Sequence, residues 1–152
     1  MSAENRSRGS DSIRQQTRPQ ELGEVTIREG LDSLSAIRVA TLFRRAPLFR
    51  KTGSSSRLWE AFEASSLTLS AWHDGQLVGL VRMMTDGVLF SYICDIAVEP
   101  DVQRLGIGRR LMDEAFERVK GTRVFVLDEQ IKSGYFTRAG FERVGNMWSK
   151  MS

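Results

Sequence analysis

A strand that runs into a glycine turn and then into a helix is the feature that most constrains how this chain can fold. Residues 90–98 are apolar apart from Ser91 and Asp95, and such a run is typical of a strand buried on both faces. Pro100 then ends the strand, because proline has no N–H for the ladder and restricts the residue before it. From Gly108 onward, apolar residues recur at helical spacing opposite a charged face. We therefore expect a central strand followed by a helical crossover.

The turn between this strand and helix, residues 103–108, is suited to binding an anion. It contains two glycines, which have no Cβ and so let backbone N–H groups face outward. The first N–H groups of a helix lack intrahelical partners and lie at the positive end of its dipole, where a phosphate or pyrophosphate can bind. Arg104, Arg109 and Arg110 add positive charge there. An ordinary glycine-containing turn is the alternative, because the spacing is neither the Walker pattern nor the three-glycine dinucleotide motif.

Two motifs in the chain resemble those of a known family. Gln-x-x-Gly-x-Gly at 103–108, preceded by Asp-Ile-Ala-Val-x-Pro at 95–100, resembles the acetyl-CoA-binding motif of GNAT-type N-acetyltransferases. Tyr-Phe-Thr-Arg-Ala-Gly-Phe at 135–141 is similar to that family's later motif, commonly Phe-Tyr-x-x-x-Gly-Phe. The resemblance implies an α/β (α+β) fold of the GNAT type. In that fold an antiparallel meander is followed by a parallel βαβ unit, in one mixed sheet of about six to seven strands flanked by about four helices.

Periodicity and turn signals predict the other elements. Alternating apolar residues indicate strands, apolar residues at helical spacing indicate helices, and Ser or Asp before such a helix indicates its cap. Two Asp-Gly pairs and one Gly-Asn pair predict tight hairpin turns. The expected elements are a strand at 25–29, a helix at 34–42 capped by Asp32 or Ser33, a helix at 57–64 capped by Ser56, strands at 67–72, 76–84 and 123–127, a helix at 129–138, and a hairpin of 141–144 with 147–150.

Composition and charge indicate the class of protein. The hydrophobic fraction of 41% and the charged fraction of 27% are those of a soluble globular protein, and the formal net charge of +3 is mildly basic. Much of that charge lies near the N-terminus and beside the glycine turn, so no nucleic-acid partner is needed to explain it. One cysteine excludes an internal disulfide and gives no metal cluster. The chain shows no membrane-spanning run and no signal peptide, so we expect a cytoplasmic protein without a membrane partner.

The chain divides into an arm and one domain. Residues 1–21 are rich in Ser, Arg and Gln, and we expect a disordered arm because they cannot bury enough apolar surface to offset their ordering entropy. Residues 22–152 are long enough for a core of their own and are expected to form a single GNAT acetyltransferase domain.

The resemblance also implies the ligands. It implies acetyl-CoA as co-substrate without a metal, and a small-molecule or peptide amine as acceptor; a homodimer is possible. Family members bind the pantetheine arm at the end of the central strand and cover the acceptor with the first two helices. The residues implied for acetyl-CoA binding are Ile96, Ala97, Val98, Gln103, Arg104, Leu105, Gly106, Ile107, Gly108 and Arg109. Those implied for acceptor binding are Phe49, Trp59 and Tyr92, with packing of its helix as the alternative role of Trp59.

Acetyl transfer needs a group that takes a proton from the amine and one that gives a proton to the departing thiolate. Asp95 and Glu99 are the carboxylates near the strand end, and a water chain is the third candidate. Alternatively, Asp95 satisfies backbone groups and Glu99 is a solvated loop charge. Aligning the later motif places Phe136 at the family's donor tyrosine, with Tyr135 one residue early and pointing about 100° away. We therefore expect delivery by water, with Tyr135 as the other candidate.

Three functions fit this sequence. The favoured one is an N-acetyltransferase in which the amine attacks acetyl-CoA directly in a ternary complex. One alternative is a transferase that uses another acyl-CoA. The other is an acyl-CoA-binding module with little or no catalysis, which the phenylalanine at position 136 suggests.

Overall fold

A five-stranded mixed sheet forms the centre of the protein. The computed structural model describes residues 23–46, 54–128 and 134–150. The strands lie in chain order, with three antiparallel pairings followed by a parallel pairing of the last two. They are β1 (Val25–Glu29), β2 (Leu67–His73), β3 (Gln76–Thr85), β4 (Phe90–Val98) and β5 (Arg123–Val126). The fold class expected from the sequence is confirmed, although the described sheet has fewer strands than expected.

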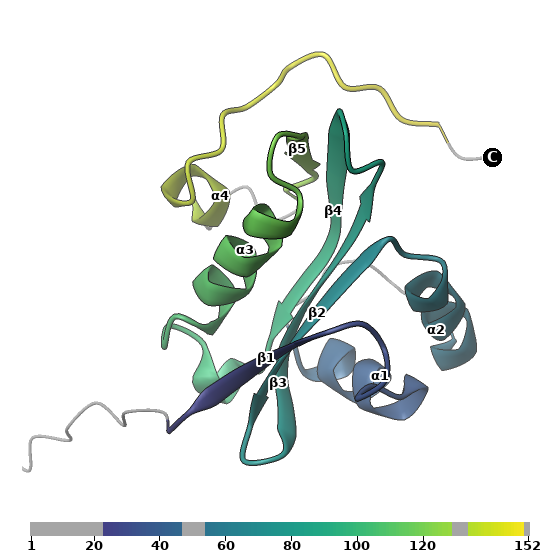
Figure 1. Ribbon diagram of the computed structural model, residues 1–152, viewed down its shortest axis with the longest axis vertical. Helices are drawn as coiled ribbons and strands as arrows, with labels where there is room; N and C mark the ends of the chain where they lie inside the picture. Colours follow the sequence, from purple (N-terminus) through teal and green to yellow (C-terminus); the bar gives the residue numbers. More distant parts are fainter. Residues whose placement is uncertain (1–22, 47–53, 129–133, 151–152) are drawn as a thin grey trace, which may run out of the picture.

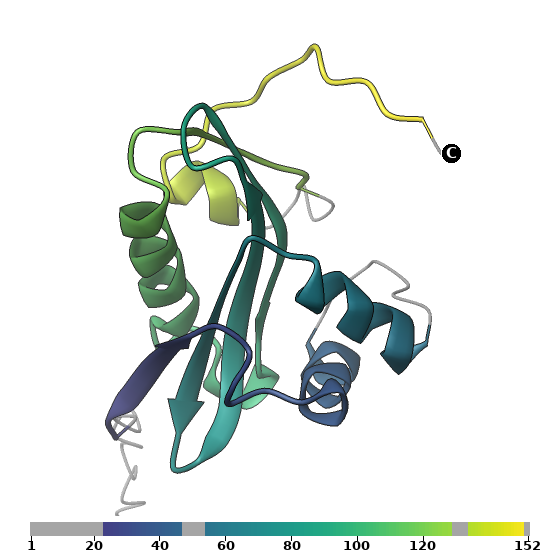
Figure 2. The same cartoon turned by 45° about the vertical axis from the view of Figure 1, so that its right-hand side comes forward.

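Helices cover both faces of the sheet (Figures 1 and 2). One helix, α3, lies on one face, and α1 and α2 lie together on the other. The helices are α1 (Ala36–Arg45), α2 (Ser55–Glu63), the 3-10 turn η1 (Pro100–Val102), α3 (Ile107–Arg118) and α4 (Tyr135–Arg138). None of the helices in the described part of the chain is long and apolar enough to span a bilayer.

Serine residues cap the first two helices. The Ser35 hydroxyl accepts the N–H of Arg38 at 3.4 Å, and the Ser54 hydroxyl accepts the N–H of Arg57 at 3.3 Å. The caps expected at Asp32 or Ser33 and at Ser56 are therefore wrong. Neighbouring serines offer the same side chain, and the cap is the one whose own backbone stays extended while the next residue turns helical.

A β-bulge redirects the side chains of β4. Arg82 of β3 faces Asp95, whereas Met83 faces Ile93, so Cys94 is the extra residue. Because side chains alternate along a strand, the bulge leaves Ile93 in the core beneath α3 and sends Asp95 to the side of α2. Buried residues of β4 therefore occur on both faces, with Ile93 in the core beneath α3 and Ala97 in the core beneath α1 and α2. The strand neighbours of these two residues are half-buried, so the expected burial on both faces is only partly met.

The C-terminal hairpin expected at 141–150 is not formed. These residues belong to no strand, although a turn is present at 145–146, and Trp148 is 94% exposed. A two-stranded hairpin is marginal in water unless a third strand or a helix packs on it, and the apolar side chains of this segment beyond Phe141 remain exposed. The expected arm at 1–21, Phe49 and the first residues of the expected helix at 129–138 lie outside the described residues.

Candidate active site

The turn before α3 has a backbone conformation that few residues tolerate. Gly106 caps α3 with φ of +83°, and Arg104 has φ of +68°, which is uncommon for a residue with a Cβ. The first intrahelical bond runs from the N–H of Arg110 to the oxygen of Gly106 at 2.9 Å. The N–H groups of residues 106–109 therefore have no intrahelical acceptor, and they lie at the positive end of the dipole.

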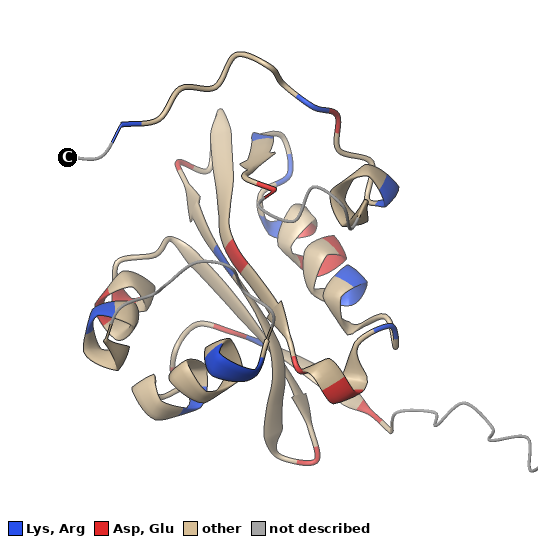
Figure 3. Cartoon of the chain, turned by 180° about the vertical axis from the view of Figure 1, so that it is seen from behind, with Lys and Arg blue, Asp and Glu red and all other residues tan. Residues whose placement is uncertain are grey.

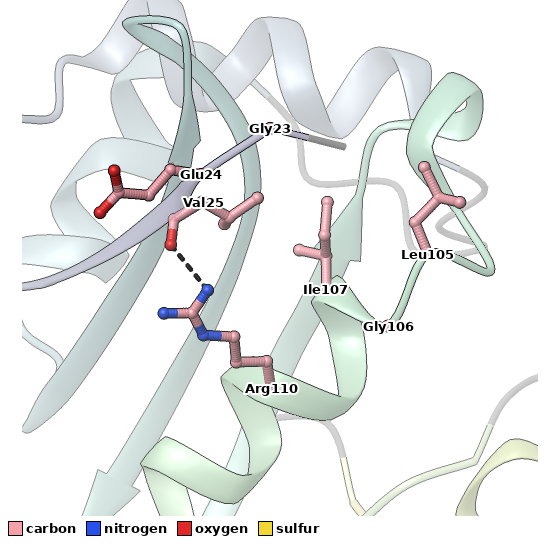
Figure 4. A pocket seen from close by; sticks show the side chains of 7 residues that line it. All are labelled: Gly23, Glu24, Val25, Leu105, Gly106, Ile107 and Arg110. Carbon is pink, nitrogen blue, oxygen red and sulfur yellow. Dashed lines mark hydrogen bonds between the residues drawn. The ribbon is translucent and has the colours of Figure 1, made fainter. Parts of the chain in front are cut away.

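Three hydrogen bonds fix this turn to the sheet. The Gln103 side-chain amide donates to the oxygen of Val98 at 3.0 Å, and the N–H of Glu99 donates to the oxygen of Val78 at 2.9 Å. Arg110 donates to the oxygen of Val25 at 2.7 Å, which ties the start of α3 to β1 (Figure 4). The side chain of Gln103, which the sequence implies for acetyl-CoA binding, joins the turn to the end of β4.

Open space borders the turn. A hollow of about 410 Å³ lies between the start of β1 and the start of α3 (Figure 4). A Cβ added at Gly106 would have no atom within 4 Å. Arg104 and Arg109 are exposed, and Arg109 lies 3.6 Å from Asp113 on the next turn of the helix. A ligand can therefore reach both the backbone N–H groups and these charges.

The pairing of the two parallel strands ends before β4 itself does. Their pairing ends at Ile93 and Val126, whereas β4 continues along β3 to Val98. The last residues of β4 thus pair with β3 and extend beyond β5. Among the expected acetyl-CoA-binding residues, Ala97 and Ile107 are buried, while Ile96 and Val98 are half-buried. Leu105 is exposed at the turn.

Tyr135 and Phe136 point into different surroundings. A Cβ built on Gly108 would lie 3.2 Å from the Tyr135 hydroxyl and 3.5 Å from Val98, so the close approach of α4 depends on glycine at 108. Burial raises the pKa of Tyr135, Asp113 raises it further, and Arg109 opposes them. The Phe136 ring instead packs edge-on against Phe141 with 5.4 Å between centroids.

Both expected carboxylates form ion pairs with arginines. The Asp95 carboxylate accepts the Nε–H of Arg82 at 2.6 Å, and its side chain is 5% exposed. Glu99 is 17% exposed and accepts the Nε–H of Arg45 at 2.7 Å, while Arg45 also donates to Asp101 at 2.9 Å. Sequence reasoning missed both arginines. The signal for Arg82 was a single charge in an apolar strand, matched by the single charge of Asp95 in the strand that follows.

The expected acceptor residues that the structure describes lie on the same side of the sheet as α2. Trp59, on α2, stacks on Phe62 with 6.5 Å between centroids and donates its indole N–H to Glu63 at 2.9 Å. Tyr92 lies on β4 opposite Met84 of β3. The packing role of Trp59 is therefore shown, and its exposed part leaves room for a second role.

Comparison with known proteins agrees with this geometry. A family model of the acetyltransferase (GNAT) domain matches residues 49–150. The chain therefore belongs to the GNAT acetyltransferase family. A curated protein of Gibberella zeae, described by its name as a presumed acetyltransferase, is 46% identical over 44 residues, which are 29% of this chain and 25% of that protein. The match thus spans about a quarter of the length of this relative.

Solved structures of the family share the fold. A GNAT-family acetyltransferase of Streptococcus pneumoniae TIGR4 superimposes with a TM-score of 0.70 at 25% identity, covering 85% of this chain and 100% of that one. A GNAT-family acetyltransferase of Brucella melitensis, solved in complex with acetyl-CoA, gives a TM-score of 0.62 at 22% identity, covering 79% of this chain and 84% of that one.

Proposed function

We propose that this protein transfers the acetyl group of acetyl-CoA to a primary amine while both are bound. One observation carries the proposal: the glycine turn of α3 lies directly against the Tyr135 hydroxyl, where β4 extends beyond β5. An anion-binding turn, a strand edge and a half-buried proton donor are parts that acetyl transfer from a thioester requires. The family membership supports the same reaction class.

The residues at the turn fit the phosphate end of acetyl-CoA. The N–H groups of residues 106–109 would hold the pyrophosphate, and Arg104 and Arg109 would add attraction from the surface. The backbone of residues 96–98 would pair with the pantetheine arm along the strand edge. When bound, acetyl-CoA supplies an activated thioester carbonyl, which these contacts would place at the end of β4.

Glu99 is the better candidate for taking the proton of the amine. An alkylammonium has a pKa near ~10.4, so a nearby group or a water must accept its proton before attack. Asp95 is buried and held by Arg82, which makes it a link between β4 and α2. Glu99 is more exposed, stands at the strand end, and is bound through Oε2 to Arg45. We therefore assign proton acceptance to Glu99, directly or through one water.

Tyr135 is the proposed proton donor to the departing thiolate. A tyrosine hydroxyl is protonated at neutral pH, and burial raises the pKa of Tyr135 above its ordinary value, so the hydroxyl has a proton to give to the thiolate as the C–S bond breaks. The position of this hydroxyl beside Gly108 favours Tyr135 over delivery by water. Phe136 has no hydroxyl to offer and lies among aromatic rings.

A glycine substitution tests the proposed acetyl-CoA site. Gly106→Asp would add a negative charge where the pyrophosphate is proposed, and calorimetry should show CoA binding weakened by about tenfold or more. Gly121→Asp is the matched control, because Gly121 also has a positive φ of +92° and open space but follows the opposite end of α3. An unchanged CoA affinity in folded Gly106→Asp, or an equal loss in Gly121→Asp, contradicts the site. CoA binding without thiol release from any amine would indicate a binding module.

A further inference from the structure

Three charged side chains, which we call the Arg45 cluster, surround the proposed proton acceptor: Arg45, Glu99 and Asp101. The Nε–H of Arg45 donates to Oε2 of Glu99 at 2.7 Å, and its Nη2–H donates to the Asp101 carboxylate at 2.9 Å. Both carboxylates lie in the turn that follows β4, whereas Arg45 is the last residue of α1. In Figure 3 the blue end of α1 lies beside the red turn after β4. One side chain of the helical layer therefore binds both acidic side chains of this turn.

The backbones that carry Arg45 and Glu99 are fixed independently of this ion pair. The N–H of Glu99 donates to the oxygen of Val78 on β3 at 2.9 Å. Ala46, which follows Arg45, is buried in the same core as Ala97 of β4. The core thus holds the end of α1 at a constant distance from the end of β4. The guanidinium of Arg45 can therefore decide where the Glu99 side chain lies.

Arg45 occupies one oxygen of Glu99 and leaves the other for the amine. Oε2 accepts the Nε–H, whereas Oε1 accepts no hydrogen bond from the described part of the chain. A general base acts only within hydrogen-bond reach of the proton that it takes, and an unrestrained glutamate would sample several rotamers. Holding one oxygen therefore prepares the other for proton transfer before the amine binds.

Asp101 contributes to the geometry and to the charge of the Arg45 cluster. Arginine presents its donors in a rigid planar fork, so a second carboxylate on a second N–H fixes the plane of the guanidinium. Two carboxylates face one guanidinium, which leaves the cluster with one net negative charge. Such a charge attracts an acceptor that arrives as an ammonium ion.

We infer that Arg45 is a positioning residue for acetyl transfer, because it holds Oε2 of Glu99 so that Oε1 can take the proton of the ammonium group. This inference rests on the proposed function and adds a residue of α1 to that site. The proton passes from the ammonium nitrogen to Oε1, the neutral amine forms the C–N bond, and Arg45 keeps its own protons. Arg45 is 53% exposed, and ion pairs of exposed side chains add little stability. Loss of Arg45 should therefore slow the reaction without unfolding the protein.

Variants of α1 test this role in thiol release from acetyl-CoA with propylamine. Arg45→Met should lower kcat/KM by about tenfold while the melting temperature and the CoA affinity stay unchanged. Arg45→Lys keeps the charge without the fork and should retain more of the rate than Arg45→Met. Arg44→Met is the matched control, because it removes the same charge from the same turn of α1, where Arg44 donates to Thr41 at 3.0 Å. This control should retain the native rate.

Two comparisons separate positioning from any other role of Arg45. Trifluoroethylamine is a weak base that is uncharged at neutral pH, so Arg45→Met should affect it several-fold less than propylamine. In a Glu99→Gln background, Arg45→Met should cause no further loss, because Arg45 acts through Glu99. Equal losses with both amines, a further loss in the Glu99→Gln background, or a native rate in folded Arg45→Met overturns this inference alone. If the native protein releases no thiol with any primary amine, the proposed function fails, and this inference fails with it.

Discussion

Tyr135 places its hydroxyl near the turn that starts α3, whereas its neighbour Phe136 has no hydroxyl and packs against Phe141. We expect Tyr135→Phe to lower kcat by about 10²-fold, at the lower end of the ~10²–10⁴ typical of a general acid. CoA affinity should change little, because the substitution removes one hydroxyl and keeps the ring. Steady-state thiol release at saturating amine measures kcat, and calorimetry measures the affinity.

Phe136→Tyr is the matched control at the residue scale. The ring at 136 packs edge-on against Tyr135 and Phe141, so an added hydroxyl should not reach the turn and turnover should not rise. The opposite pair of results would contradict the assignment of Tyr135. An unchanged rate in Tyr135→Phe together with a gain in Phe136→Tyr would show that water delivers the proton in the native protein.

Residues with a local reason for their type could be predicted from the sequence, and residues with a distant partner could not. Gly106 follows from the conformation that a strand-to-helix turn demands, and it has a positive φ of +83°. Arg45 binds Glu99, which is 54 residues away in the chain. Arg82 of β3 binds Asp95 on the neighbouring strand β4. Those pairings depend on the register of the sheet and on where α1 ends, which no local pattern specifies.

At the scale of elements, the turn between β3 and β4 offers a test of pH dependence. One oxygen of Asp86 accepts the N–H groups of Val88, Leu89 and Phe90 at 2.8, 2.8 and 3.0 Å. These bonds lower the pKa of Asp86 below its ordinary 3.8. A carboxyl whose pKa is lowered by folding stabilises the protein above its unfolded pKa, and this stabilisation is lost as the pH falls through the folded value.

Asp86→Asn should therefore be less stable than the native protein at neutral pH, and the difference should vanish at a pH below the folded pKa. The asparagine keeps an acceptor oxygen but loses the charge that strengthens the three bonds. Thermal unfolding across a pH series measures the difference, with Asp74→Asn in the β2–β3 turn as the control. A difference that is the same at every pH would show that the charge of Asp86 is irrelevant to the turn.

The same scale shows which elements a sequence specifies. The span of β4 could be predicted because its apolar run is bounded by a turn and a proline. The bulge at Cys94 could not, because it depends on how β3 pairs with β4. The C-terminal hairpin was predicted from a Gly-Asn turn and alternating apolar residues. A turn signal fixes a local bend, but a hairpin also needs a surface to pack on, and Val144, Met147 and Trp148 remain exposed.

At the scale of the whole molecule, Arg82 joins the sheet to the helical layer formed by α1 and α2. Its guanidinium binds Asp95 of β4 at 2.6 Å, Ser65 at 3.1 Å and the oxygen of Ala61 at 3.3 Å, where α2 ends. It also lies 5.4 Å from the centre of the Phe62 ring. A cation at the carboxyl end of a helix is favourable for the dipole, so this one side chain orients α2 on the sheet.

Removing Arg82 should therefore lower the free energy of unfolding far more than removing an arginine from the surface. Arg82→Met leaves the buried Asp95 carboxylate without its counter-charge, which costs about 3–5 kcal/mol of unfolding free energy. Arg118→Met is the matched control, because Arg118 also binds two carboxylates, Glu29 and Glu114, each at 2.7 Å, but in an exposed setting. Surface pairs of that kind contribute about 0–1 kcal/mol each. Denaturant unfolding measures both variants, and equal losses would show that the Arg82–Asp95 pair is not what holds the two layers together.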